Sequence, residues 1–321
     1  KMVNKQNKKY DIVGIGNAIV DLIAEVDDSY LKKNNICKGA MSLVDYNTIN
    51  KIGNDVDIVN TISGGSVANS VVCISQQNLK TAFIGKVNDD TMGVKFADGL
   101  AKENVHFKIN KSSTDKKTAR CVILVSPDAE RTMNTYLGVS QELTEQDIDM
   151  KMIEESNLLY LEGYLWDLDN AKKAIRKAIE TARHSDAIVA FSISDKFCVD
   201  RFRDEFLEIV HNCSDIIFAN ESEVKSLFET NKLEYAIKEC QNTSKIFALT
   251  LGESGAIIIK NNEIIDIKPE KIENLVDTTG AGDLFAAGFL SHFLKLKNLE
   301  ECGKEGVRLA SIIIQKFGAR I

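Results

Sequence analysis

The chain has 321 residues, of which 44% are hydrophobic and 27% are charged. This composition supports a sizeable core, predicts one folded domain over residues 1–321 and argues against wholesale disorder. The formal net charge of −7, with both signs interspersed, argues against nucleic acid or an anionic membrane as the main partner. A small anion bound by local backbone amides stays compatible with this charge.

The seven cysteines are scattered and contain no Cys-x-x-Cys pair, and the four histidines are equally dispersed. This usage predicts reduced thiols in a cytoplasmic protein, with no zinc site at recognisable spacing. The basic start is followed by an apolar stretch that Gly14, Gly16 and Asp21 interrupt. We therefore expect neither a signal peptide nor a transmembrane span.

Short apolar runs alternate with longer helical patterns along most of the chain. This alternation predicts an α/β protein with a central, mostly parallel sheet flanked by helices. Apolar residues recur at helical spacing over residues 170–183 and 304–317, which predicts core-facing helices there. The expected strands are residues 10–16, 81–87, 158–161, 187–193, 216–219 and 246–251.

Two segments, residues about 20–46 and 107–138, break this alternation because they carry strand-like pieces without a long helix between them. We expect them to form a small, mainly antiparallel sheet inserted in the α/β core. Such a sheet can act as a lid that excludes water from a crevice. The strand-like pieces are residues 22–26, 41–44, 120–126 and 132–137.

Residues 277–283 read Asp-Thr-Thr-Gly-Ala-Gly-Asp and run into an apolar helical stretch. Small residues at a helix start leave backbone N–H groups free, and the helix dipole adds positive charge, so the amides of Gly280, Ala281 and Gly282 are a candidate phosphate site. Asp283 would repel a phosphate there unless it accepts the proton of an attacking hydroxyl. We expect the helix N-terminus to keep this candidate base ionised. The alternative is an N-cap aspartate behind an ordinary turn.

Other common phosphate motifs are absent. No Gly-x4-Gly-Lys-Ser/Thr sequence occurs, and the dinucleotide fingerprint that begins at Gly14 has Ile19 where its third glycine belongs. An oxidoreductase is therefore disfavoured. The first strand nevertheless brings Asn17 and Asp21 to its carboxyl end, where Asp21 can accept hydrogen bonds from two neighbouring sugar hydroxyls or serve as a turn residue.

A pair of glycines precedes another apolar helical run. Gly64 and Gly65 suit a hinge or a close backbone contact, and Asn69, one turn further on, could face the same pocket. A plain loop leading into a helix is the alternative.

Two motifs follow later strands. Asn220 and Glu223 either form a capping box or organise Mg²⁺ and its waters near a triphosphate. Thr250, Gly252 and Gly255 form either a hairpin turn or the floor of a nucleotide site, with Thr250 as a hydrogen-bond donor. The sequence leaves both pairs of alternatives open.

Two further side chains have a structural and a functional interpretation. Arg131 in the expected lid is either a surface arginine or a cation that folds over a transferring phosphoryl group. Tyr164, just past a predicted strand, either packs in the core or stacks on a base.

Taken in order, these stretches resemble the ribokinase-like (PfkB) family of sugar and nucleoside kinases, from residue 10 to about 318. The resemblance implies a ribokinase-like fold with a small β lid, and a monomer or homodimer that acts on a small molecule. It also implies ATP and Mg²⁺ as co-substrates, with dependence on a monovalent cation left open, and transfer of the γ-phosphate to a hydroxymethyl group.

The same resemblance implies roles for individual residues. Asp283 would be the base and Gly280 to Gly282 the anion hole, with Arg131 over the phosphoryl group. The two motifs nearest the N-terminus, residues 14–21 and 63–70, would bind the sugar. The later motifs, which begin at Asn220 and Thr250, would bind the ATP and, through water, the metal. The substrate residues would be Asn17, Asp21, Gly64, Gly65, Asn69 and Tyr164, and the metal and ATP residues Asn220, Glu223, Thr250, Gly252 and Gly255.

Within the family, residues 14–21 and 63–70 are most similar to adenosine kinases, and Tyr164 lies where an aromatic ring stacks on adenine. Residues 38–43, in contrast, do not match the typical eukaryotic adenosine kinase lid. The preferred substrate is therefore the 5′-hydroxyl of a ribose-containing nucleoside, adenosine first. A sugar kinase of the same family and a non-catalytic nucleoside- or sugar-binding protein are the alternatives.

Overall fold

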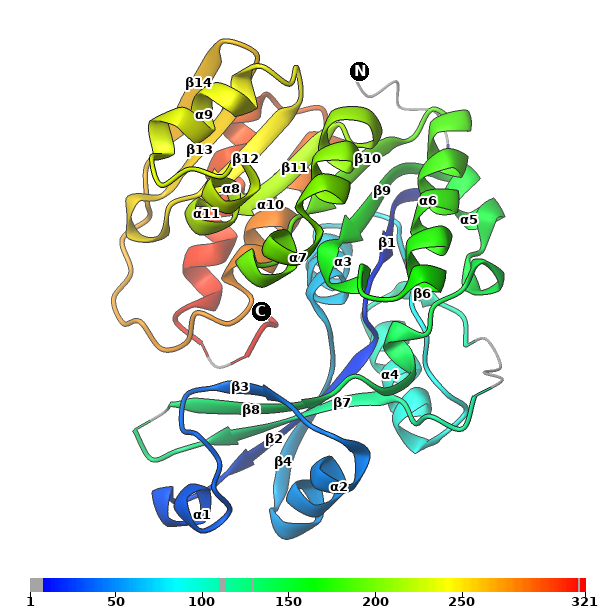
Figure 1. Cartoon of the computed structure of the whole chain (residues 1–321), viewed down its shortest axis with the longest axis vertical. Helices are drawn as coiled ribbons and strands as arrows, with labels where there is room; N and C mark the ends of the chain where they lie inside the picture. Colours follow the sequence, from blue (N-terminus) through cyan, green and yellow to red (C-terminus); the bar gives the residue numbers. More distant parts are fainter. Residues whose placement is uncertain (1–7, 110–113, 129, 317) are drawn as a thin grey trace.

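The computed structural model describes residues 8–109, 114–128, 130–316 and 318–321. These residues form a nine-stranded sheet with helices on both faces and a separate five-stranded sheet below it (Figure 1). The predicted ribokinase-like α/β architecture is confirmed. Phe317, which ends one predicted helix, and residues 110–113 and 129 of the expected lid lie outside the described part of the chain.

The nine-stranded sheet is parallel except for its last two strands, β13 and β14, which run antiparallel to their neighbours. All the strands predicted from apolar runs belong to it, with small shifts at their ends. Strand β13 follows the candidate hairpin turn at Gly252 and Gly255, whereas the pattern predicts neither β6 nor β14. These two strands form the edges of the sheet and have little of the burial that produces an apolar run. In spatial order the strands are β14 (Glu263–Ile267), β13 (Ala256–Lys260), β12 (Ile246–Thr250), β11 (Ile216–Asn220), β10 (Ile188–Ser192), β9 (Ser156–Glu162), β1 (Tyr10–Ile15), β5 (Thr81–Ile84) and β6 (Val105–Phe107).

Two helical layers cover this sheet, because alternate residues of its strands join one of two apolar clusters. One layer contains α3 (Ser66–Gln76), α4 (Thr91–Lys102), α10 (Ala281–Leu294) and α11 (Leu299–Ile313). The other contains α5 (Met150–Glu154), α6 (Asp169–His184), α7 (Lys196–Glu208), α8 (Glu221–Leu227) and α9 (Leu233–Gln241). The short helical turns are η1 (Gly138–Gln141), η2 (Glu145–Asp147), η3 (Gly163–Leu165), η4 (Ile209–Cys213) and η5 (Gly252–Ser254).

The helix predicted at 170–183 is confirmed by α6, whereas the one predicted at 304–317 is displaced. Helix α11 begins earlier because Asn298 and Glu301 form a capping box, in which Asn298 Oδ1 accepts the Glu301 amide at 2.8 Å. It ends at Ile313, and the carbonyl of Ile314 accepts the amides of Val276 and Asp277 instead. The end of this helix thus supports the loop that precedes α10.

The five-stranded sheet has the order β3 (Met41–Leu43), β8 (Arg131–Tyr136), β7 (Ala119–Val125), β2 (Ile19–Glu25) and β4 (Ile58–Gly64). The predicted mainly antiparallel pairing is wrong, because β2 pairs parallel with β7 and β3 pairs parallel with β8. Strands β2 and β7 each follow a strand of the large parallel sheet, β1 and β6, and so leave it in the same direction. Strand β4 lies outside the segments predicted for this sheet.

One face of the five-stranded sheet is covered by α1 (Asp28–Lys33) and α2 (Tyr46–Asp55), which lie below it in Figure 1. Leu31, Ile49 and Ile52 of these helices join the same apolar cluster as Leu22 and Val122 of the sheet. The opposite face, which carries Asp21, is turned toward the large sheet.

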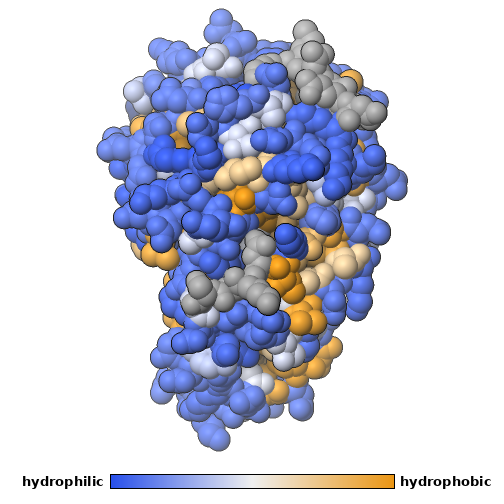
Figure 2. All heavy atoms as spheres, turned by 90° about the vertical axis from the view of Figure 1, so that its right-hand side faces the viewer, coloured by the Kyte–Doolittle hydropathy of each residue, from blue (hydrophilic) through white to orange (hydrophobic). Residues whose placement is uncertain are grey.

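The surface is largely hydrophilic on the side that Figure 2 shows, with apolar residues in local patches. In the described part of the chain, no helix is both long and apolar enough to cross a membrane.

Strand β1 and helix α3 pack unusually closely at Gly14. A Cβ atom there would lie 2.5 Å from Val67 Cγ1 and 2.6 Å from Val71 Cγ2. We expect Gly14→Ala to lower the free energy of unfolding by about 1–3 kcal/mol, because the helix must move away from the sheet. Urea unfolding measures the change.

Gly53→Ala is the matched control. A Cβ at Gly53, inside α2, would meet only Val122 Cγ2 at an ordinary 3.8 Å. The same substitution should therefore raise stability by about 0.5–1 kcal/mol. Equal effects at the two glycines would contradict the packing argument.

Candidate active site

The candidate residues gather at the carboxyl ends of the parallel strands. Asn17 follows β1, Glu162 ends β9, and Asn220 and Thr250 end the neighbouring strands β11 and β12. This edge of an open α/β sheet is where such folds bind ligands. The start of α10 reaches the same region, because α10 packs against α3 beside β1.

The start of α10 has the geometry of an anion site. Gly280 is its N-cap, with φ at +79°, and a Cβ there would lie 2.7 Å from Ala319 Cβ, so only glycine fits. A Cβ at Gly282 would meet nothing within 4 Å, which leaves open space beside this residue. The Ala281 amide donates to the Thr278 carbonyl at 3.2 Å, so the predicted set of three free amides is too large.

Asp283 does not cap its own helix, so the alternative of an ordinary N-cap aspartate is wrong. Its Oδ1 accepts a hydrogen bond from Ser66 Oγ at 2.6 Å and its Oδ2 one from Asn69 Nδ2 at 3.0 Å. Ser70 Oγ donates to its main-chain carbonyl at 2.8 Å. Three side chains of α3 therefore fix the orientation of the candidate base.

Burial raises the pKa of Asp283 above its ordinary value, an effect that the helix start alone does not predict, and ionisation of the group at neutral pH stays a prediction. The hydrogen bonds from Asn69 and Ser66 and the charge of Arg320 act in the opposite direction. Part of the side chain stays accessible to solvent. A partly desolvated carboxylate is a stronger proton acceptor than an exposed one, which suits a general base.

The Gly64-Gly65 pair joins β4 directly to α3. A Cβ at Gly64 would lie 2.3 Å from Asp21 Oδ2, and one at Gly65 (φ +111°) would lie 2.2 Å from the Asn17 carbonyl oxygen. The predicted close contact is therefore present twice. It brings the Asp21 carboxylate against the backbone just before the helix that holds Asp283.

Asp21 and Asn69 keep hydrogen-bonding capacity for a ligand. Burial raises the pKa of Asp21 to about 7, although Arg320 and Arg131 oppose this rise. Asn69 Oδ1 is buried and has no hydrogen-bond partner among the described residues. Asn69 Oδ1 can therefore accept a hydrogen bond from a ligand hydroxyl, and the sugar-binding role of both residues stays a prediction.

Glu162 is a site residue that the sequence analysis missed as a separate candidate. It is 1% exposed and accepts hydrogen bonds from the Asn17 amide, Asn17 Nδ2 and the Val67 amide, at 2.9, 3.0 and 3.0 Å. Burial raises its pKa to about 7. Glu162 therefore ties the end of β1 to the first turn of α3.

Arg131 is not a surface arginine. Its Nη1 lies 2.9 Å from Asp277 Oδ2, and the two side chains are 6% and 8% exposed. Asp277 also accepts the amides of Thr279 and Gly318, at 2.9 and 3.2 Å. The ion pair joins the first residue of β8, in the second sheet, to the loop that precedes α10.

Asn220 and Glu223 form the capping box that the sequence allows. The Asn220 amide and Nδ2 donate to the two oxygens of Glu223 at 2.9 and 2.8 Å, and Asn220 Oδ1 accepts the Glu223 amide at 2.9 Å. Burial raises the pKa of Glu223 to about 7. Among the described residues, no group of three or more His, Cys, Asp or Glu side chains could hold a metal. The donor set fits Mg²⁺ carried mainly by phosphate oxygens and water.

Thr250, Gly252 and Gly255 form the hairpin between β12 and β13. Gly252 and Gly255 have φ of +58° and +90°, and a Cβ at Gly255 would lie 2.2 Å from the Ile267 carbonyl oxygen. Thr250 pairs with Asn220 across the two strands, so the hairpin and the capping box lie side by side. Their nucleotide-binding role stays a prediction.

Tyr164, in η3, packs against the core, and its hydroxyl donates to the Ser194 carbonyl at 3.2 Å. The core-packing alternative is therefore present in the structure. Stacking on a base stays a prediction.

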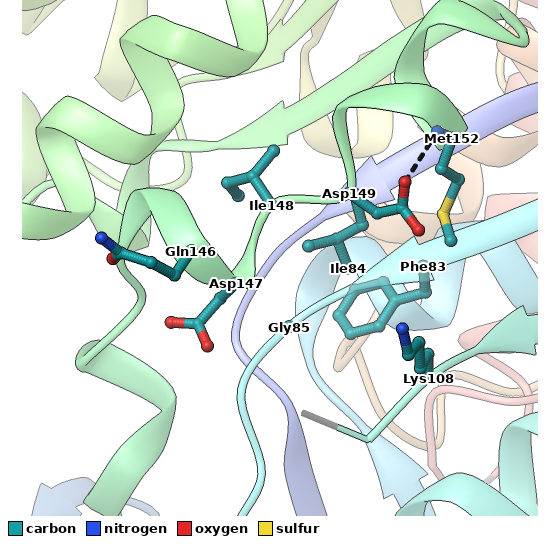
Figure 3. A pocket seen from close by; sticks show the side chains of 9 residues that line it. All are labelled: Phe83, Ile84, Gly85, Lys108, Gln146, Asp147, Ile148, Asp149 and Met152. Carbon is teal, nitrogen blue, oxygen red and sulfur yellow. Dashed lines mark hydrogen bonds between the residues drawn. The ribbon is translucent and has the colours of Figure 1, made fainter. Parts of the chain in front are cut away.

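A hollow of about 150 Å³ near the end of β5 lies apart from these residues (Figure 3). Phe83, Lys108, Asp147, Asp149 and Met152 line it, and none of the candidate site residues does. It is not part of the candidate active site.

The fold is of the α/β class, and comparisons with known proteins show that the chain is a phosphotransferase. The profile of the pfkB family of carbohydrate kinases matches residues 11–321. The chain belongs to this family. Its members are phosphotransferases that act on hydroxyl groups, so this protein is a nucleoside or sugar kinase, and the family implies use of ATP, typically with Mg²⁺.

Individual relatives fall into both substrate groups. An adenosine kinase from Sinorhizobium meliloti is 40% identical, with a TM-score of 0.87 over 98% of this chain and 96% of that chain. A probable sugar kinase from Rhizobium etli CFN 42 is 38% identical, with a TM-score of 0.88 over 98% and 95%. Adenosine kinase 2 of Arabidopsis thaliana is 26% identical over 99% of this chain and 97% of its own.

The raised pKa of Asp21 predicts how stability depends on pH. Between the pKa of the unfolded chain, near 4, and about 7, the folded state binds more protons at Asp21, so ionisation there destabilises the protein as pH rises. Asp21→Asn removes this dependence. Its free energy of unfolding relative to wild type should rise by up to about 1.4 kcal/mol per pH unit over this range.

Urea unfolding at pH 5, 6, 7 and 8 measures this difference. Asp57→Asn removes the same charge from an exposed position and should show no such trend. If the difference in unfolding free energy between Asp21→Asn and wild type does not change with pH, the pKa of Asp21 is not raised in the folded protein.

Proposed function

We propose that this protein is an ATP-dependent kinase that phosphorylates the 5′-hydroxyl of a ribose-containing nucleoside, adenosine first. Asp283 accepts the hydroxyl proton. The amide at Gly282 stabilises the charge on the transferring phosphoryl group, and the second sheet excludes water. Mg²⁺, when bound, would add positive charge beside the phosphate oxygens. Asp21 and Asn69 hold the ribose hydroxyls, while Asn220, Glu223, Thr250, Gly252 and Gly255 serve the ATP and its metal.

The single observation that carries the chemistry is the environment of Asp283. Its carboxylate shares the start of α10 with the unobstructed space beside Gly282, while Ser66 and Asn69 orient its two oxygens. A protein that only binds a nucleoside gains nothing from a carboxylate beside an anion site. This arrangement favours a catalyst over the non-catalytic alternative.

The face of the second sheet that carries Asp21 favours a nucleoside over a bare sugar. Its strand pairs place rows of apolar side chains next to Asp21, on the face opposite α1 and α2. Met41 and Leu43, at one edge, are 59% and 64% exposed. An apolar face beside the sugar subsite gives a planar base a surface to cover. The apolar residues of this face include Ile23, Met41, Leu43, Ile62, Ile123 and Met133, and its polar residues include Asn60, Arg131 and Thr135.

A sugar kinase is the second candidate. Two observations support it: the 38% identity to the Rhizobium etli protein, and residues 38–43, which do not match the typical eukaryotic adenosine kinase lid. The two candidates share fold and chemistry. They differ in whether the apolar face contacts the substrate.

Asp283→Asn tests the role of the base. The variant keeps the size of the side chain but cannot accept a proton, so we expect kcat to fall by about 10²–10⁴-fold. Circular dichroism and calorimetric titration with ATP should show an unchanged fold and nearly unchanged ATP binding. Near-wild-type turnover would refute the base assignment.

A substrate panel of adenosine, inosine, cytidine, ribose and fructose, followed by coupled ADP release, identifies the acceptor. We expect the highest kcat/KM for adenosine. Leu43→Ser should then raise the KM for adenosine about tenfold and leave that for ribose unchanged, because only the nucleoside covers the apolar face.

Ile264→Ser is the matched control for Leu43→Ser, because Ile264 is an exposed apolar residue on edge strand β14. It should change neither KM. Turnover of fructose but not adenosine by the wild type would favour the sugar kinase.

A further inference from the structure

Arg320 lies in the segment that follows α11, close to the proposed catalytic centre, and it belongs to none of the sequence motifs. The segment that carries it packs on the loop before α10, since the Gly318 amide donates to Asp277 Oδ2 at 3.2 Å and Ala319 contacts Gly280. From there the guanidinium reaches the second sheet, where its Nη2 donates to the carbonyl of Ser63. Ser63 precedes the Gly64-Gly65 pair that leads into α3.

The guanidinium is buried, and its hydrogen bond to Ser63 does not offset the free-energy cost of removing this cation from water. Its Nε and Nη1 have no hydrogen-bond partner among the described residues. A buried cation of this kind is costly unless opposite charges compensate it. Its charge acts on two carboxyl groups, Asp21 and Asp283. The Ser63 carbonyl, which the guanidinium binds, directly precedes Gly64, against which the Asp21 carboxylate packs. Burial lowers the pKa of Arg320 to about 10, which leaves it charged at neutral pH.

We propose that Arg320 is a positioning residue of the phosphoryl-transfer site, which fixes the end of β4 through the Ser63 carbonyl and supplies buried positive charge beside the carboxylates of Asp21 and Asp283. Arg320 contacts no reacting atom in this scheme; it acts through the two carboxylates. The inference rests on the proposed role of Asp283 as the base.

Other groups also face Asp283, and the test has to separate them from Arg320. Ser66 and Asn69 of α3 donate to it, and both favour the ionised form. Negative charge at Asp21 and Glu162 opposes its ionisation. Tyr160 and Tyr164 also lie within the reach of its charge. Among the groups of the described residues that act on Asp283, Arg320 is the one that carries positive charge, so its removal has a defined sign.

The experiment compares Arg320→Gln and Arg320→Lys by the pH dependence of kcat/KM. Glutamine keeps a donor for the Ser63 carbonyl but loses the charge, whereas lysine keeps the charge. The acid limb of the kcat/KM profile is the range in which activity rises with pH as the base loses its proton. In Arg320→Gln this limb should move to higher pH by about 0.5–1 unit, because the positive charge that favours the ionised base is gone. On the acid limb the Arg320→Gln variant then loses about three- to tenfold in kcat/KM, and on the plateau above that limb it approaches wild type. Arg320→Lys keeps the wild-type acid limb.

Arg308→Gln is the matched control, because Arg308 is exposed on α11 and pairs only with Glu305 on its own helix among the described residues. Its profile should match wild type. An unmoved acid limb in Arg320→Gln, or an equal shift in Arg320→Lys, would overturn the proposal.

If Arg320→Gln does not fold, the double variant Asp21→Asn/Arg320→Gln should fold again, because it lacks the carboxylate left without compensation. Failure of this rescue would also overturn the proposal.

A second measurement separates this inference from the proposed function. The kinetic comparison uses whichever acceptor the wild type phosphorylates, so a wrong acceptor does not affect it. If the wild type phosphorylates none, the proposed function fails, and stability still tests Arg320. The free energy of unfolding of Arg320→Gln should lie further below that of wild type at pH 8 than at pH 5. Without the guanidinium, the pKa values of Asp21 and Asp283 in the folded state rise further, so ionisation of these groups at high pH destabilises the variant more than wild type. A constant difference would refute the role of its charge.

Discussion

The hydrogen bonds from Ser66 and Asn69 to Asp283 hold together the N-termini of two helices, α3 and α10. Helix N-termini repel one another through their dipoles, and a carboxylate between them compensates this repulsion. The geometry around the bonds leaves little freedom: Gly65 has no room for a side chain, and Glu162 binds the Val67 amide. The sugar subsite, the anion site and the link to the second sheet all depend on this junction.

The junction concentrates buried charge. Asp21, Glu162 and Asp283 all have pKa values that burial raises. Arg131 and Arg320 reach the same region from the second sheet and from the segment after α11. Such clusters cost folding free energy, and proteins keep them where chemistry needs perturbed carboxyl groups. The large sheet and its two apolar layers provide the stability that tolerates this cost.

The strands of the large sheet could be predicted because both its faces are buried, which turns each central strand into a continuous apolar run. The pairing direction in the second sheet could not, because alternation shows which face is buried but not which neighbour a strand takes. Motif residues such as Gly280 and Asn69 stand in recognisable local patterns. Glu162 and Arg320 are single charged residues whose burial arises only when distant segments meet. The burial that raises the pKa of Asp283 could not be predicted for the same reason, since burial depends on the whole environment.

The direct passage from β4 through Gly65 into α3 has a mechanical consequence. No flexible spacer separates the sheet that would cover the substrate from the helix that holds the base, so any tilt of that sheet twists the first turn of α3. A small molecule wedged between the two sheets would thereby disturb the proton affinity of Asp283 from a distance. Such an inhibitor would need no direct contact with the reacting groups.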